Sequence, residues 1–85
     1  MKNTLLFLLQ SIVDHPDDAR VDENRDESRT LLTINVHSED TGRVIGKSGR
    51  IIKALRDLIK LMATKENTYV DVVLAADEKV PEEST

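Results

Sequence analysis

The chain has 85 residues, no cysteine and a formal net charge of −4 at pH 7. This length supports a single domain with one small core, and the missing cysteines exclude disulfides and thiolate metal sites. The negative charge argues against a nucleic-acid ligand. Its distribution reverses that argument, because residues 42–60 hold one acidic residue and six basic ones: Arg43, Lys47, Arg50, Lys53, Arg56 and Lys60.

An amphipathic helix is predicted over residues 2–14, and Pro16 ends it because proline disfavours helical geometry in the residue before it. The apolar run at residues 5–9 is too short for a signal peptide or a membrane span. We therefore expect a cytoplasmic protein with no membrane partner. Alternating apolar and polar residues then predict strands at 19–23 and 29–37. A charged turn at 24–28 joins them as an antiparallel hairpin.

The second half of the chain contains two predicted helices and a strand. Residues 38–40 offer an N-cap and an acidic first turn for a short helix ending near Ile45. A broad apolar stripe predicts a longer helix from about Arg50 to Thr64, and a third strand follows at 68–74. We expect one domain, residues 1–75, and a flexible acidic tail, residues 76–85. The element order predicts an α+β fold, a three-stranded sheet with helices packed on one face.

The loop Gly46-Lys47-Ser48-Gly49 lies between the two predicted helices and has three interpretations. A Walker A phosphate loop is excluded, because it needs four residues between its glycines and only three separate Gly42 from Gly46. A plain helix–helix turn, with glycines chosen for their backbone angles, remains open. The third interpretation is a clamp for a nucleic-acid backbone, since glycines let backbone N–H groups approach a phosphate closely.

The residues around the loop favour the clamp. Lys47 and Ser48 are expected at the exposed tip, where an ammonium and a hydroxyl group can reach phosphate oxygens. Within about one helical turn on either side lie Arg43, Arg50 and Lys53. Aliphatic side chains would form a groove for bases: Ile45 and Ile52 on one wall and Ile34 on the other.

At these residues the chain resembles a known family. Residues 44–53, Val-Ile-Gly-Lys-Ser-Gly-Arg-Ile-Ile-Lys, resemble the central signature of KH domains. With Ile-Val-Asp-His-Pro-Asp at residues 12–17 and the charged hairpin, nearly the whole chain is similar to the small bacterial single-domain KH proteins of the KhpA family. The resemblance implies the type II KH fold, binding of single-stranded RNA and an RNA-chaperone role. It also implies self-association as a dimer, pairing with a KhpB/Jag-like KH protein, and a part in cell-shape control and cell-wall biogenesis.

An alternative function is a protein-interaction or dimerisation module with weak or no RNA binding. The two aromatic residues, Phe7 and Tyr69, lie far from the loop in sequence, so the stacking on bases that strengthens many RNA complexes is expected to be small. His15 and His37 are far apart in sequence and, without cysteines, are poor evidence for a metal site. We expect no catalytic activity, no cofactor, no metal and no small-molecule substrate.

Overall fold

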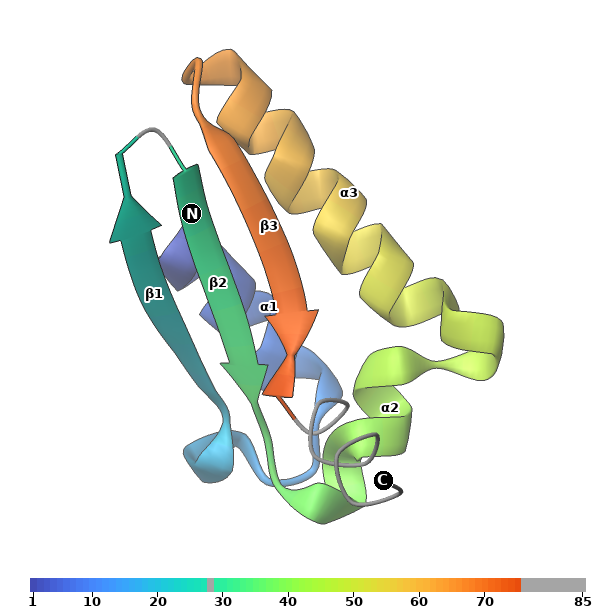
Figure 1. The fold of residues 1–85 in the computed structure, drawn as a ribbon. Helices are drawn as coiled ribbons and strands as arrows, with labels where there is room; N and C mark the ends of the chain where they lie inside the picture. The colour runs from blue at the N-terminus through green and yellow to red at the C-terminus, as the bar shows by residue number, and fades with distance from the viewer. Residues whose placement is uncertain (28, 76–85) are drawn as a thin grey trace, which may run out of the picture.

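The computed structural model describes residues 1–27 and 29–75, so the predicted tail at 76–85 lies outside the described residues. In this part of the chain, helix α1 (Lys2–Ile12) precedes the hairpin of strands β1 (Arg20–Asp26) and β2 (Arg29–Asn35). Helices α2 (Thr41–Ile45) and α3 (Arg50–Lys65) follow, and strand β3 (Tyr69–Leu74) completes the fold (Figure 1).

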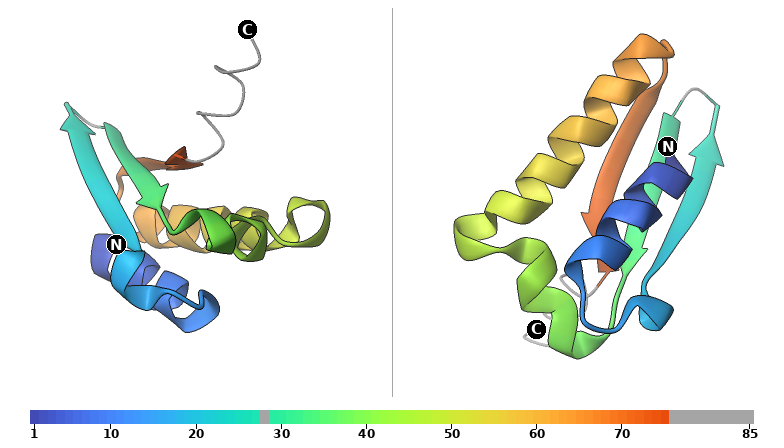
Figure 2. Two further views of the ribbon diagram at one scale, coloured as in Figure 1. Left: turned by 90° about the horizontal axis from the view of Figure 1, so that it is seen from below. Right: turned by 180° about the vertical axis from the view of Figure 1, so that it is seen from behind.

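The sheet has the order β1-β2-β3, with β1 antiparallel to β2 and β2 parallel to β3. Parallel neighbours need a long crossover connection, and α2 and α3 supply it. The helices cover one face of the sheet, while the other face has no helix over it within the described residues (Figure 2). The α+β class and the one-sided helix layer are confirmed.

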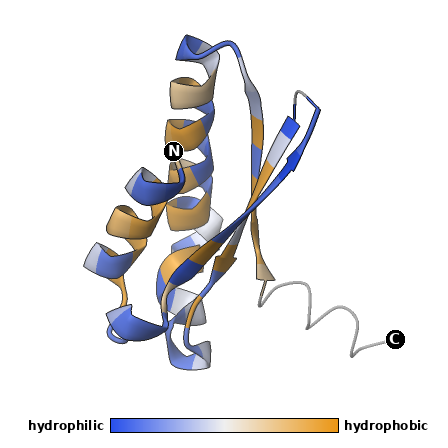
Figure 3. Cartoon of the chain, turned by 90° about the vertical axis from the view of Figure 1, so that its left-hand side faces the viewer, coloured by the Kyte–Doolittle hydropathy of each residue, from blue (hydrophilic) through white to orange (hydrophobic). Residues whose placement is uncertain are grey.

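The core lies between the helix layer and the sheet. Alternate residues of β2 and β3 point into it, among them Leu32, Ile34 and Val72, as the period-two pattern predicts. From the helices come Leu5 and Leu9 of α1 and, from α3, Ile52, Leu55 and Ile59. Figure 3 shows these apolar segments facing one another across the two layers.

Several predicted boundaries are wrong for identifiable reasons. The β1 strand continues to Asp26, through residues predicted as a turn, because their backbones pair with β2 although all their side chains are exposed. Helix α1 ends at Ile12 because the N–H groups of Asp14 and His15 donate to the Asp40 carboxylate rather than to helix carbonyls. The short helix predicted over 38–45 is a 3₁₀ turn, Ser38–Asp40, followed by α2. None of the described helices is long and apolar enough to cross a membrane.

The turn at the C-terminal end of α3 reverses the direction of the chain. Asn67 has a φ of 57°, the left-handed conformation that terminates many helices. The N–H of Thr68 donates to the carbonyl of Ala63, and that of Asn67 donates to Thr64, which together form a Schellman motif. This reversal starts β3 beside α3, so β3 is the strand that borders the long helix.

Candidate nucleic-acid interface

The loop between α2 and α3 is built from left-handed backbone conformations. Gly46 has φ 77° and ψ 175°, Ser48 has φ 58° and Gly49 has φ 74°. Position 46 needs glycine for a second reason, because a Cβ there would lie 2.6 Å from Cγ1 of Ile51. Around Gly49 a Cβ would meet no atom within 4 Å, so only its backbone angle favours glycine.

This conformation leaves donors free at the loop tip. The N–H of Gly46 donates to Gly42, and the N–H groups of Gly49 and Arg50 close the turn on the carbonyls of Gly46 and Lys47. By contrast, no hydrogen bond within the described residues occupies the N–H group of Lys47 or of Ser48. Both side chains are exposed as well. The loop therefore presents bare backbone donors, an ammonium and a hydroxyl group to solvent.

The basic residues around the loop are not equally available. Arg43 contacts Asp14 at 3.1 Å, and Lys53 contacts Asp57 at 3.0 Å. In the described chain Lys47 and Arg50 form no ion pair and are exposed, so these two cations are the ones free to meet an anion. The exposed pairs contribute at most about 1 kcal/mol each, so a phosphate can compete for Arg43 and Lys53 at small cost.

The predicted aliphatic groove is only partly present. Ile45 is half-buried and Ile52 is 7% exposed, so both keep some surface beside the loop. Ile34 is 0% exposed and cannot touch a base, which corrects its assignment to the second wall. The physical reason is the sheet order: β2 is the central strand, and Ile34 points from it into the core under the helices.

The strand beside α3 is β3, and sequence reasoning did not place it there. Arg56 Nε donates to the carbonyl oxygen of Val72 at 2.9 Å and so links α3 to the outer edge of β3. Arg56 entered the sequence argument only as a positive charge. The spacing of Arg56 could have indicated its position. It lies four residues after Ile52 and four before Lys60, which places the three residues on one side of the helix.

A polar cluster holds α2, and with it the loop, against the end of α1. The buried Asp40 carboxylate accepts hydrogen bonds from the N–H groups of Asp14 and His15, each at 3.0 Å. Burial acts to raise the pKa of Asp40, but these two hydrogen bonds, with the nearby imidazoles of His15 and His37, hold that pKa below its usual value of 3.8.

The same cluster brings together two histidines that are distant in sequence. The rings of His15 and His37 stack with centroids 4.1 Å apart, and nitrogen and oxygen atoms of these residues and Glu39 lie within 4.8 Å of one another. Sequence distance was therefore a wrong argument against their meeting. The Glu39 carboxylate contacts His15 Nε2, and the backbone N–H of Glu39 donates to His37 Nδ1. These contacts link the turn after α1 to the 3₁₀ turn that precedes α2.

Comparison with known proteins identifies the family. A family model described as the KhpA/KhpB KH domain matches residues 2–74. The chain belongs to this family. Its KH domain is 47% identical over 72 residues to a protein of Clostridium acetobutylicum, covering 85% of this chain and 96% of that protein.

Two further relatives show a similar match to this KH domain. A protein of Leifsonia xyli is 46% identical over 69 residues, covering 81% of this chain and 91% of the relative. A protein of Halalkalibacterium halodurans is 43% identical over 70 residues, covering 82% of this chain and 92% of the relative. All three relatives are named RNA-binding protein KhpA. No solved structure gives a significant match. The family predicted from residues 12–17 and 44–53 is confirmed.

Proposed function

We propose that this KH domain binds single-stranded RNA without catalysing a reaction, and that the loop of residues 46–49 clamps the RNA backbone. The observation that carries the proposal is that, within residues 1–27 and 29–75, no hydrogen bond occupies the N–H groups of Lys47 and Ser48 and no ion pair engages Lys47 or Arg50. Relatives that match over most of the chain are named as RNA-binding proteins, which supports the same ligand. Phosphates would lie at residues 46–49, with Arg43 and Lys53 nearby, and bases would follow Ile45 and Ile52.

The experiment is a comparison of two double variants with equal charge change. Lys47→Asp with Ser48→Asp should abolish RNA binding and leave the fold intact, because aspartate tolerates the left-handed conformation at position 48. Lys2→Asp with Asn3→Asp makes the same change at the exposed start of α1 and should bind like the parent. Equal loss in both variants would mean that total charge, not the loop, sets the affinity.

The salt dependence of RNA affinity is a second test of the proposed phosphate contacts at the loop. The logarithm of the RNA affinity should fall with the logarithm of salt concentration, with a slope of about −0.7 per phosphate neutralised. A salt-independent affinity would contradict a backbone clamp.

The family resemblance supports finer roles for the domain. We propose an RNA chaperone in the bacterial cytoplasm that forms a dimer or pairs with a KhpB/Jag-like KH protein and acts in cell-shape control and cell-wall biogenesis. Strand-annealing and strand-exchange assays with the purified protein test the chaperone role. Unchanged annealing rates at protein concentrations that saturate the RNA would refute it.

A second candidate function, a protein-interaction module, is favoured by exposed apolar side chains on the helices. Phe7 on α1 is 67% exposed and Leu61 on α3 is 69% exposed. Size-exclusion chromatography with light scattering, with and without RNA, separates the two functions. A dimer that ignores RNA supports the interaction module alone, whereas a shift in mass on adding RNA supports the RNA-binding protein.

A further inference from the structure

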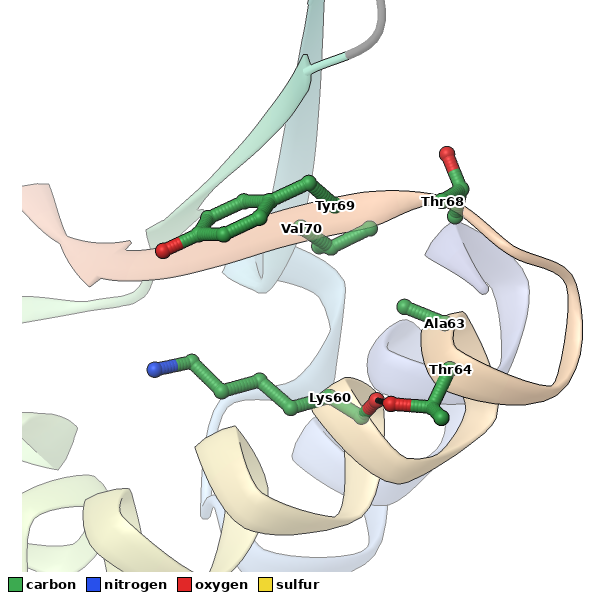
Figure 4. Close-up of a pocket in the computed structure, with 6 residues that line it drawn as sticks. All are labelled: Lys60, Ala63, Thr64, Thr68, Tyr69 and Val70. Atoms are coloured by element: carbon green, nitrogen blue, oxygen red, sulfur yellow. Dashed lines mark hydrogen bonds between the residues drawn. The ribbon is translucent and has the colours of Figure 1, made fainter.

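A pocket of about 170 Å³ lies between the second half of α3 and the start of β3, at the end of the helix away from the glycine loop (Figure 4). The buried side chains of Ala63 and Val70 form its apolar floor. Lys60, Thr64, Thr68 and Tyr69 complete its lining. A cavity of about 150 Å³ holds one benzene molecule, so this pocket is suited to a single six-membered ring.

Tyr69 gives the pocket an exposed aromatic wall. Tyr69 is 54% exposed, and a tyrosine ring combines a large apolar face with a polar hydroxyl group. The guanidinium of Arg29, its register partner on β2, lies 4.9 Å from the ring centroid and stabilises the ring's position. Figure 4 shows the Tyr69 ring and the Lys60 side chain extending in the same direction from β3 and α3, with an opening between them. A flat ring can enter that opening and stack on the tyrosine.

The polar atoms of the pocket suit an uncharged ligand with hydrogen-bonding edges. Thr64 donates its hydroxyl proton to the Lys60 carbonyl, so its oxygen remains available as an acceptor. The single lining cation, Lys60, has the Asp71 carboxylate 4.0 Å from its Nζ. That carboxylate offsets the charge of Lys60 and disfavours a phosphate here. A nucleobase, by contrast, has a flat face for Tyr69 and donors and acceptors on its edge.

The pocket and the loop lie at opposite ends of the same helix, α3. Arg50 begins α3 at the loop, and Lys60 is ten residues further along, a distance of about 15 Å on a helix. Between them, Arg56 marks the boundary of α3 and β3 through its bond to Val72. An RNA strand clamped at the loop and running along this boundary would arrive at Tyr69.

We propose that this pocket is a second RNA subsite, in which a pyrimidine base beyond the nucleotides held by the loop stacks on Tyr69. The proposal rests on the proposed RNA binding at residues 46–49. It predicts that RNA long enough to pass the loop and reach the pocket binds more tightly than a short RNA, and that the gain depends on the aromatic ring.

Intrinsic fluorescence tests the contact directly, because Tyr69 is the only tyrosine and the chain has no tryptophan. Octauridylate should quench the emission of Tyr69. Tetrauridylate should not, because a KH loop clamps about four nucleotides and none of this short RNA would extend to the pocket. A tyrosine amide titrated alongside corrects for light absorbed by the bases. Binding of octauridylate without quenching would overturn the proposal.

Affinity measurements on variants give an independent reading. Tyr69→Ala should weaken octauridylate binding about 5-fold to 150-fold, the range for one base stacked on an aromatic ring, and leave tetrauridylate binding unchanged. Tyr69→Phe keeps the ring and should retain the affinity, and Phe7→Ala is the matched removal of an exposed aromatic ring elsewhere. Equal affinities of Tyr69→Ala and the parent for octauridylate would contradict the subsite. Loop variants that bind both oligonucleotides like the parent would instead contradict the proposed function.

Discussion

Ile51 packs so closely over Gly46 that a Cβ at position 46 would lie 2.6 Å from its Cγ1. The first residues of α3 therefore fix the glycine that opens the loop, and the loop's shape is coupled to the packing of the helix. Gly42 and Gly49 have no such neighbour within 4 Å, so the three glycines differ in what they require.

Substituting alanine for each glycine should separate these requirements. Gly46→Ala combines a positive φ with a steric clash and should lower the free energy of unfolding by about 3 kcal/mol. Gly49→Ala meets only the left-handed backbone penalty of about 1–2 kcal/mol. Gly42→Ala, in α2 and without a positive φ, should raise stability by about 0.5–1 kcal/mol. Urea denaturation measures all three, and equal losses at positions 46 and 49 would contradict the Ile51 contact.

The Asp40 cluster predicts how stability depends on acid. The pKa of Asp40 is lowered in the folded protein, so the unfolded chain takes up the proton first as pH falls. Its stabilising contribution is complete above about pH 5 and is lost as pH falls through 3.8 and below. Asp40→Asn should be less stable at pH 7 and should lose less stability than the parent between pH 5 and pH 3. Thermal denaturation at each pH measures the stability of both proteins. If stability fell equally with pH in the parent and the variant, the role given to the Asp40 carboxylate would be contradicted.

Ile34 should behave as a core residue and not as a contact to RNA. Ile34→Val removes one buried methylene-sized group and should cost about 0.5–1.5 kcal/mol of folding free energy. RNA affinity, measured at a temperature where the variant is fully folded, should stay equal to that of the parent. A clear loss of affinity in the folded variant would restore Ile34 to the base-binding wall.

The two arginines that flank the loop should differ in their effect on RNA binding. Arg50→Gln removes a cation that forms no ion pair with any described residue, and it should reduce the salt slope by about 0.7, the contribution of one phosphate. Arg43→Gln should have a smaller effect, because Asp14 already partly neutralises Arg43 at 3.1 Å. Fluorescence anisotropy over a range of salt concentrations measures both slopes. A larger change for Arg43→Gln would mean that RNA displaces Asp14 and uses Arg43 first.

The sequence predicts the elements and the loop well because each leaves a local pattern. Alternation along residues 29–37 identifies β2, which ends two residues earlier at Asn35. The apolar stripe from Ile51 to Met62 identifies α3 within one residue of its end. Gly46 and Gly49 mark a turn through their spacing. In each case the residues that carry the signal are neighbours along the chain.

What the sequence does not reveal depends on contacts between distant residues. Pairing of β2 with β3 gives no local sequence pattern, so the strand beside α3 was not predicted and Ile34 was wrongly assigned to the groove wall. The meeting of His15 and His37 likewise follows from Asp40, which binds the backbone 25 and 26 residues earlier. A charged segment such as Asn24–Asp26 gives no strand pattern, because the strand there is held by backbone hydrogen bonds alone.

The central claim is that RNA phosphates bind the backbone of the loop tip. Nitrogen-15 NMR during an RNA titration observes one by one the N–H groups of Lys47 and Ser48, which no hydrogen bond occupies in the described part of the chain. Hydrogen bonds to phosphate should shift these amide signals downfield, and the largest changes should cluster at residues 46–50. Changes centred on Phe7 or Leu61, with an unaffected loop, would contradict the account.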